Sequence, residues 1–225
     1  MEDLLSEPDN ETVIMKTTTG IIISLFLLGA CGQLTHKSPK QLNAIKDDGI
    51  DISMVQSIKD YYHGTYGEGT RLEEAADTSA VALSYFITTE NEEENDGRLI
   101  VITIPLIRDQ DLWGAKPILE GDLNNDLKND LVITVHTEFG NSAAQEIFVF
   151  INEQENYRLA IVTGYQDLSG CNGYFWARRI ENNLIIGNSS CFAPEDAMCC
   201  PSLHYQTKVA FDSNELKFVS KRSIP

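Results

Sequence analysis

The sequence predicts an α+β fold that is mostly antiparallel β-sheet with one or two helices, following an N-terminal signal segment. Two observations predict the sheet. Apolar residues alternate with polar or small residues in many short runs, and short Asn/Asp-rich turns separate several of these runs. A third observation predicts a helix, because near the start of the folded part apolar residues recur every three to four positions. No sequence repeat of propeller or solenoid period is present.

The helix is expected over residues 51–62. Asp51 can cap the first turn by accepting its free backbone amides. The glycines that follow at positions 64, 67 and 69 should end the helix, because glycine is a poor helix former. The apolar face that predicts the helix consists of Ile52, Val55, Ile58 and Tyr62.

The remaining elements are expected to be strands, taken in chain order. Strands are predicted at residues 81–87, 99–104, 131–136, 146–151 and 157–163, with a turn at residues 95–97 before the second of them. Two hairpins follow. One pairs residues 174–180 with 184–186 around a turn at 181–183, and the other pairs 203–211 with 216–219 around a turn at 212–214.

The N-terminal segment carries the three parts of a bacterial secretory signal. Lys16 follows Met15 and supplies a positive charge, residues 21–28 are almost entirely apolar, and small residues precede Cys31. The apolar run is shorter than the ~20 residues that a membrane-spanning helix needs. The segment is therefore interpreted as a cleaved signal.

The end of this signal resembles the lipobox of bacterial lipoproteins, and it reads Leu28-Gly29-Ala30-Cys31. In a lipobox the cysteine thiol receives a diacylglycerol thioether and the peptide is cut just before it. The resemblance implies a lipid anchor of palmitate-type chains at Cys31, with each buried CH₂ contributing ~0.8 kcal/mol to membrane attachment. The expected location is the cell envelope, outside the cytoplasm. Gly32 rather than Asp follows the cysteine, and by resemblance to the sorting rules of bacterial lipoproteins this implies the outer membrane if the host has one.

These observations divide the chain into four parts. Residues 1–14 are acidic, which conflicts with a positive signal start, and are interpreted as a mis-assigned start extension. Residues 15–30 are the signal peptide, and residues 31–50 are a polar, lipid-anchored tether. Residues 51–225 are expected to form a single β-rich exported domain, long enough to bury a sizeable core.

The charge of the chain restricts its partners. The 17 basic and 34 acidic residues give a net charge of −17, and removing residues 1–30 leaves 16 against 29, a net charge of −13. A chain this acidic repels nucleic acid, so no nucleic-acid partner is expected. The expected partners are the membrane, through the lipid at Cys31, and a protein or an envelope polymer.

Four cysteines are left once Cys31 carries lipid, and an even number in an exported chain predicts two disulfides. Pairing between the adjacent Cys199 and Cys200 is expected to be strained. Cys171 and Cys191 are therefore each expected to pair with one of these two. A zinc site is the alternative, although no C-x-x-C pair is present.

The window with the clearest chemistry is the polar loop of residues 121–130. Oxygen-bearing side chains recur in it at alternating positions, a spacing that turns them toward one centre, and Ca²⁺ takes 6–8 oxygen ligands. The candidate ligands are the side chains of Asp122, Asn124, Asp126 and Asp130 and the carbonyl of Lys128.

The loop resembles the calcium loops of FG-GAP and integrin-type repeats, which precede a strand, but Leu127 stands where those loops have glycine. A left-handed backbone at that position would be strained for leucine. The alternative is a metal-free loop whose side chains accept its own backbone amides as Asx-turns.

A wider resemblance covers the chain from Gly121 onward. A lipobox signal, a Gly-Asp-Leu-Asn-x-Asp loop ahead of a strand, a later hairpin, and Cys199-Cys200-Pro201-Ser202 leading into a strand resemble the LppP/LprE-type lipoproteins and related exported proteins of other bacteria. The resemblance implies a surface lipoprotein with no established catalytic activity.

The chain offers weak signals for an enzyme. No G-x-S-x-G or H-E-x-x-H motif occurs, and of the four histidines His136 lies nearest the polar loop in sequence. A sugar-binding surface is suggested by aromatic residues, although Phe175 and Trp176 cannot share a strand face; these residues are Trp113, Tyr174, Phe175 and Trp176. The favoured function is a non-enzymatic envelope module for interaction or maintenance, and the alternative is an envelope hydrolase or carbohydrate-binding protein.

Overall fold

The computed structural model describes residues 50–67, 71–76, 79–87, 98–108, 116–140, 142–154 and 156–224, all within the unit His36–Pro225. The expected signal, the turn at 95–97 and Trp113 lie outside these ranges, as does the expected tether apart from Ile50. Ile50 is buried and its amide donates to the Leu106 carbonyl, so the packed part begins one residue before the expected boundary.

Helix α1 (Ile52–Tyr66) begins where the sequence predicts. The Asp51 side chain accepts the Ser53 amide at 2.8 Å, which satisfies one of the free donors of the first turn. The helix continues four residues beyond the expected end, through Gly64, and stops at Gly67, whose φ of 79° few other residues adopt. Its buried face comprises Met54, Val55, Ile58 and Tyr62.

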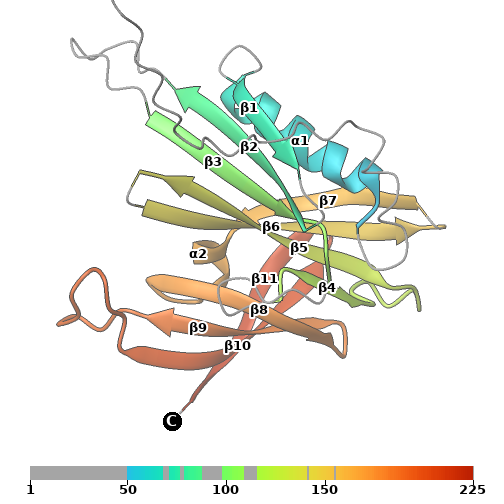
Figure 1. The fold of residues 1–225 in the computed structure, drawn as a ribbon. Helices are drawn as coiled ribbons and strands as arrows, with labels where there is room; N and C mark the ends of the chain where they lie inside the picture. Colours follow the sequence, from blue (N-terminus) through green and yellow to red (C-terminus); the bar gives the residue numbers. More distant parts are fainter. Residues whose placement is uncertain are drawn as a thin grey trace, which may run out of the picture. The chain divides into compact units, whose positions relative to one another are not determined.

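A large sheet follows the helix, and its strands run β1-β2-β3-β5-β6-β7, with every neighbouring pair antiparallel (Figure 1). Both β3 and β4 pair with the same edge of β5. Residues 130–133 of β5 pair with β4, and residues 136–139 pair with β3. The strands are β1 (Arg71–Ala76), β2 (Ala80–Ile87), β3 (Arg98–Pro105), β4 (Ile118–Gly121), β5 (Asp130–Phe139), β6 (Ser142–Glu153) and β7 (Asn156–Gly164).

A four-stranded antiparallel sheet, in the order β11-β10-β9-β8, completes the fold after the short helix α2 (Tyr165–Leu168). Both expected hairpins are present. Their two-residue turns, Asn182-Asn183 and Ser213-Asn214, have positive φ throughout, as type I′ turns require. The strands are β8 (Gly173–Glu181), β9 (Leu184–Cys191), β10 (Leu203–Asp212) and β11 (Glu215–Ser223).

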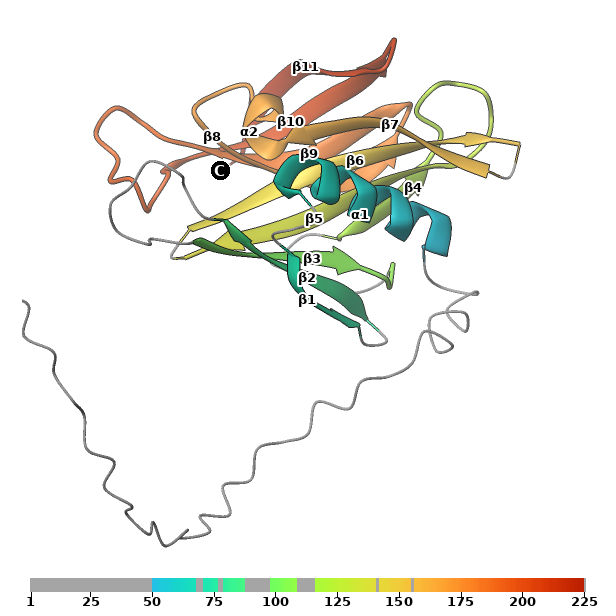
Figure 2. The same ribbon diagram turned by 90° about the horizontal axis from the view of Figure 1, so that it is seen from above.

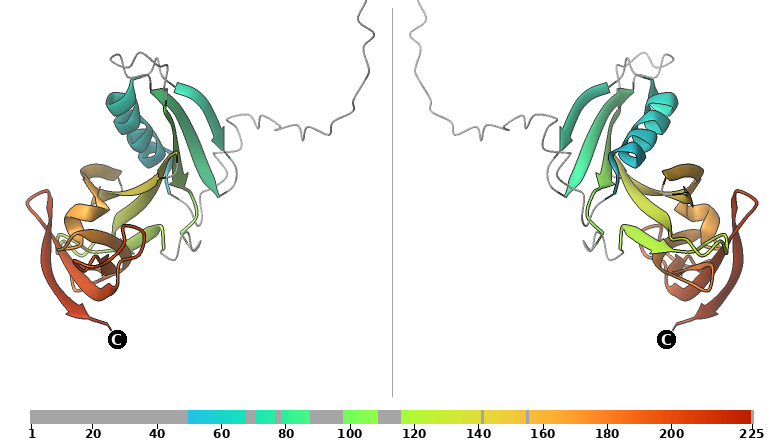
Figure 3. Two further views of the ribbon diagram at one scale, coloured as in Figure 1. Left: turned by 90° about the vertical axis from the view of Figure 1, so that its left-hand side faces the viewer. Right: turned by 90° about the vertical axis from the view of Figure 1, so that its right-hand side faces the viewer.

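The large sheet is covered on both faces (Figures 2 and 3). Along β5 and β6, alternate side chains point to opposite sides. Ile133 and Phe148 pack in the cluster that contains α1, whereas Val132 and Val149 pack in the cluster that contains Phe175 and other residues of the small sheet. The layers are therefore helix, large sheet and small sheet.

The expected fold class, mostly antiparallel sheet with one or two helices, is confirmed for the described residues, which contain two helices. Three elements were missed: β1, β4 and α2. β1 is rich in charge and alanine, and the other two have only four residues each, too short for a period to be read. Within the described ranges, neither helix has the length and apolarity to cross a membrane.

Candidate functional site

The strongest candidate site is a cavity of about 270 Å³ between the β5–β6 hairpin, α2 and β8. One wall is aromatic and comes from α2 and β8. The other wall comes from β5 and β6 and is small and polar. The lining residues are His136, Ala143, Ala144, Gln145, Tyr165, Tyr174 and Trp176.

The alternation along β8 decides which of its aromatic side chains reach this cavity. Phe175 is 1% exposed and packs in the core between the two sheets, together with Ala177. Tyr174 and Trp176 therefore project from the other face of β8, which is an edge strand. The expectation that Phe175 and Trp176 do not share a face is confirmed, and Phe175 belongs to the core.

The rings of the aromatic wall are arranged in a row. Tyr165 and Tyr174 are stacked, with centroids 5.3 Å apart and planes 24° apart, and Trp176 is 5.8 Å from Tyr174 at 41°. Phe192 braces Tyr174 from the side, edge-on at 5.7 Å. Contacts of this kind are worth ~0.5–1.5 kcal/mol each beyond buried area, so the row is held in place before any ligand arrives.

The polar wall is built from a cross-strand pair. His136 of β5 lies directly opposite Gln145 of β6 in the ladder, and Ala143 and Ala144 leave space beside them. The His136 side chain is 13% exposed, and its Nε2 is 3.4 Å from a Glu138 oxygen. The cavity therefore has donors and acceptors facing its aromatic rings.

The other described histidines have structural neighbours. His63 Nδ1 is 2.9 Å from the Tyr85 hydroxyl, and His204 Nδ1 is 3.0 Å from the Ser190 hydroxyl. His136 lines the candidate site, whereas the sequence singled it out for a different reason, its nearness to the polar loop.

The polar loop after β4 is wrapped around its own side chains. Asp122 Oδ1 accepts the amides of Asn125 and Asp126 at 2.7 and 3.2 Å, and its Oδ2 accepts the amide of Leu127 at 2.9 Å. Asn124 Oδ1 accepts the Asp126 amide at 3.0 Å. Asp126 Oδ1 accepts the amide of Lys128, the residue whose carbonyl is a candidate ligand, at 2.9 Å. This is the Asx-turn arrangement that was the alternative to a metal site.

Asp130 is separated from the other candidate ligands by burial. Its carboxylate is completely buried, and its two oxygens accept the amides of Leu123 and Asn152 at 2.8 and 2.9 Å. Burial raises the pKa of Asp130, as do the charges of Asp126 and Asp122, whereas the two amide hydrogen bonds lower it. Asp130 therefore fastens the loop and β6 to the start of β5.

The backbone of the loop is left-handed at Asn125 and Leu127, with φ of 65° and 68°. The expected demand for positive φ at Leu127 is thus observed, and its side chain is 92% exposed. No group of three or more His, Cys, Asp or Glu side chains placed to hold a metal occurs in the described part of the chain. Calcium binding at this loop stays a prediction.

A wider, open hollow of about 590 Å³ lies beside the loop. It is lined mainly by polar side chains, and the amide of one of these, Asn129, donates to Glu120 at 2.8 Å. The lining residues are Glu120, Lys128, Asn129, Asn152, Gln154 and Tyr157.

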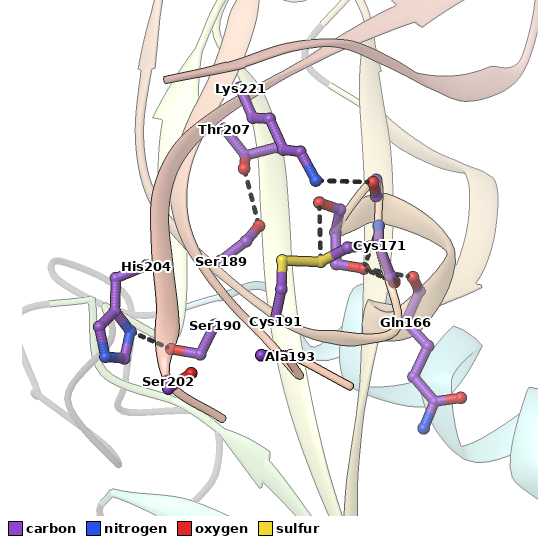
Figure 4. Close-up of a disulfide and its surroundings, with 12 residues drawn as sticks. Gln166, Cys171, Ser189, Ser190, Cys191, Ala193, Ser202, His204, Thr207 and Lys221 are labelled. Carbon is purple, nitrogen blue, oxygen red and sulfur yellow. Dashed lines mark hydrogen bonds between the residues drawn. A yellow bond between two sulfur atoms is a disulfide. The ribbon is translucent and has the colours of Figure 1, made fainter. Parts of the chain in front are cut away.

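The cysteines pair differently from the expectation. Cys171 is bonded to Cys191 (Figure 4). Cys199 is bonded to Cys200. The prediction that Cys171 and Cys191 each pair with Cys199 or Cys200 is therefore wrong. The physical reason is the register of the β8–β9 hairpin, which pairs Gly173 with Cys191 and brings Cys171 alongside. The Cα atoms of Cys171 and Cys191 are 5.9 Å apart, a common disulfide separation.

The adjacent cysteines lie on an exposed loop between β9 and β10. Asp196 gathers the ends of this loop, because its Oδ2 accepts the amides of Ala193 and Ser202 at 2.7 and 2.8 Å. These hydrogen bonds lower the pKa of Asp196. Among the cysteines in the described residues, Cys171 and Cys191 are bonded to each other, which leaves Cys199 and Cys200 to pair with one another.

The fold and the cavity together define a three-layer antiparallel β domain with a small aromatic-lined pocket. The chain matches no model of a known protein family, and comparisons with curated proteins and with solved structures find no match either. The resemblance to the LppP/LprE-type lipoproteins thus stays a prediction from the motifs, as does lipidation of Cys31, which lies outside the described residues.

Proposed function

We propose that this chain is a lipid-anchored lipoprotein of the cell envelope whose folded domain is a non-catalytic binding module. The observation that carries the binding role is the pocket lined by Tyr165, Tyr174 and Trp176 opposite His136 and Gln145. Ligand sites are typically concave, mostly apolar and furnished with a few polar groups, and this pocket has that composition.

The anchor is supported by the sequence alone. A positive start, an apolar run and the lipobox-like ending place Cys31 where a lipoprotein carries its thioether. The acidic chain opposes nucleic acid as a partner, so a protein or an envelope polymer is proposed in addition to the membrane.

The anchor is tested by the Cys31→Ser substitution in a bacterial host fed labelled fatty acid. The wild-type chain should take up label and lose residues 1–30, because the thiol is the site of acylation and cleavage follows acylation. The variant should stay unlabelled and uncut. Equal labelling and equal mass of the two chains would overturn the proposed anchor.

The alternative of an envelope hydrolase has less support. Hydrolysis by a side-chain nucleophile needs a base and an orienting group beside that nucleophile. His136 and Glu138 supply a base with a carboxylate neighbour, but among the described lining residues of the pocket none is a serine, threonine, cysteine or carboxylate. The binding role is therefore favoured, and the chain is proposed not to be an enzyme.

Weak calcium binding at the polar loop is a second proposed property. It is supported by the oxygen spacing of Asp122, Asn124 and Asp126 and by the left-handed turns at Asn125 and Leu127, which curl the loop. Extracellular calcium sites bind at ~10⁻⁴–10⁻³ M, so an imperfect ligand set is compatible with filling. Bound calcium would have to share oxygens that already accept backbone amides.

Calcium is tested by thermal unfolding of the full chain. A ligand that binds only the folded state stabilises it by RT ln(1 + [L]/Kd), ~2.7 kcal/mol at a hundredfold excess over Kd. The midpoint should rise in millimolar calcium but not in magnesium, which demands stricter octahedral geometry. Asp126→Ala should abolish the rise. Leu127→Gly should raise the midpoint equally with and without calcium, because the loop already holds Leu127 in the left-handed conformation that strains a leucine.

The matched control is Glu195→Ala, which removes an exposed carboxylate from the β9–β10 loop and should keep the calcium response. If the wild-type midpoint does not move at about 10 mM calcium, roughly ten times the weak-site range, the loop is an Asx-rich turn only.

A further inference from the structure

The chemistry of the aromatic pocket narrows the class of ligand it can take. Tyr165, Tyr174 and Trp176 give the cavity an apolar aromatic wall, with neighbouring ring centroids 5.3 and 5.8 Å apart. Because Tyr165 and Tyr174 are stacked on each other, the rings form a row rather than a box around a central point. A row suits a flat molecule laid along it, whereas a quaternary ammonium group is usually held by rings on several sides.

The charge around the pocket disfavours an anionic ligand. None of the described lining residues is lysine or arginine, and the charged neighbour of His136 is the carboxylate of Glu138. The whole chain carries a net charge of −17, which repels anions further. The ligand should therefore carry no negative charge.

The polar wall requires a ligand with hydroxyl or amide groups. The Gln145 amide can both donate and accept, and the His136 imidazole can do either according to its tautomer. These groups line the same cavity as the rings, so the ligand needs both an apolar face and polar groups. The volume of about 270 Å³ lies just below the usual range of ~300–1,000 Å³ for ligand pockets, which limits the part of the ligand inside to one ring.

We infer that the pocket binds a neutral pyranose ring of a carbohydrate, with its C–H face on Tyr174 and Trp176 and its hydroxyl groups on His136 and Gln145. This inference rests on the proposed binding role of the pocket. An equatorially substituted, β-1,4-linked sugar fits best, because such a ring has flat C–H faces and a rim of hydroxyl groups.

The test is a titration of the full chain in a detergent without a sugar headgroup. The chain has 2 tryptophans, so a Trp113→Phe background leaves Trp176 as the sole indole reporter. Cellotetraose and chitotetraose are the probes, and at least one should shift the Trp176 emission saturably, with Kd on the order of 1 mM for contact with a single ring. Ligand-observed NMR on the same mixtures detects binding that leaves fluorescence unchanged.

Variants separate stacking from general damage to the fold. Tyr174→Ala should weaken binding about tenfold, the factor that ~1.4 kcal/mol of lost ring contact gives, while Tyr174→Phe should retain it. Gln145→Ala should weaken binding with the stacking row intact. Tyr205→Ala is the matched control, because Tyr205 lies on β10 of the same sheet and does not line the pocket.

Choline and inorganic phosphate are the comparison probes. If no sugar binds, they show whether only the carbohydrate inference is wrong or the binding role of the pocket as well. If choline binds saturably in the pocket and neither sugar does, the carbohydrate inference is wrong while the binding role stands. If neither sugar, choline nor phosphate gives a fluorescence or NMR response, the inference and the binding role of this pocket are both wrong. Sugar binding that Tyr174→Ala leaves unchanged would also overturn the inference, because the sugar would then lie elsewhere.

Discussion

Glu146 is a carboxylate held by two tyrosine hydroxyls, and it fastens helix α1 to the large sheet. Tyr61 donates to Oε1 at 3.1 Å, and Tyr62 donates to Oε2. Tyr62 is completely buried, and its hydroxyl is also 3.5 Å from Thr137 Oγ1. Since both oxygens of the carboxylate are bonded, the helix docks in one position against β6.

This network makes the domain sensitive to alkali. Burial and the negative charge of Glu146 raise the pKa of Tyr61 to about 12 and also raise that of Tyr62. The unfolded tyrosines ionise near pH ~10. Below pH ~10 the two tyrosines contribute fully to the free energy of unfolding. This contribution is lost as the pH rises toward their pKa values in the folded state, because in that range only the unfolded state has released the protons.

The free energy of unfolding should therefore fall between pH ~10 and ~12, by up to about 1.4 kcal/mol per pH unit for each tyrosine that is linked. Urea denaturation at a series of pH values measures this slope. Tyr62→Phe should reduce it, whereas Tyr205→Phe, on the far sheet, should not. A slope unchanged by Tyr62→Phe would show that other groups cause the alkaline loss.

Among the elements, the β8–β9 hairpin is held in place by a tight turn at one end, a disulfide at the other and hydrogen bonds nearby. Its Asn182-Asn183 turn sets the register near the turn, and a bulge between Ala177 and Arg179 shifts it by one residue, so that Gly173 pairs with Cys191. The Cys171–Cys191 disulfide then joins the open end of the hairpin (Figure 4). Nearby, the Ser189 and Thr207 hydroxyls are 2.7 Å apart, and the Lys221 ammonium donates to the Gly170 carbonyl at 3.1 Å. The same hairpin presents Tyr174 and Trp176 to the pocket.

The two disulfides should contribute very differently to stability. Cys171 and Cys191 are 20 residues apart, and closing a loop of that size stabilises by ~2–4 kcal/mol. The double substitution Cys171→Ala with Cys191→Ala should lower the free energy of unfolding by about that amount. The Cys199–Cys200 disulfide joins adjacent, exposed residues and closes no loop. The double substitution Cys199→Ser with Cys200→Ser should therefore change the free energy of unfolding by no more than ~0.5 kcal/mol.

Non-reducing peptide mapping checks the pairing itself. It should recover a peptide from the β8 side joined to one from β9 through Cys171 and Cys191. Recovery of either cysteine joined to Cys199 or Cys200 would contradict the structure.

At the scale of the whole molecule, the two sheets are in close contact at the β4–β8 end. The sheets approach closely where β4 meets β8: a Cβ added to Gly121 would lie 2.7 Å from Ile180 Cγ2. The Asn183 side chain also donates to the Asp122 carbonyl at 3.0 Å, so the polar loop is tied to the β8–β9 turn.

Gly121→Ala should therefore destabilise the domain by ~1–3 kcal/mol, the usual cost of overpacking a close contact. Gly64→Ala is the matched control, because Gly64 lies within α1 with nothing within 4 Å of the added Cβ. That substitution should raise stability by about 1 kcal/mol, since alanine is the better helix former. Denaturant unfolding measures both, and a loss for Gly64→Ala equal to that for Gly121→Ala would contradict the packing argument.

The sequence alone determined the features that depend on neighbours along the chain. Asp51 capping α1, the alternation in β2 with Val81, Leu83 and Tyr85 buried, and both type I′ hairpin turns follow from local rules of period and turn chemistry. The Asx-turn alternative at the polar loop is equally local.

Only the tertiary structure decided the features that join distant segments. The disulfide pairing depended on extending the β8–β9 register to Cys191, and the burial of Asp130 depended on the Asn152 amide of β6. The pocket was visible in the sequence only as separate aromatic residues. His136 and Tyr174 are 38 positions apart, and packing of the two sheets, which no local period records, brings them to one cavity.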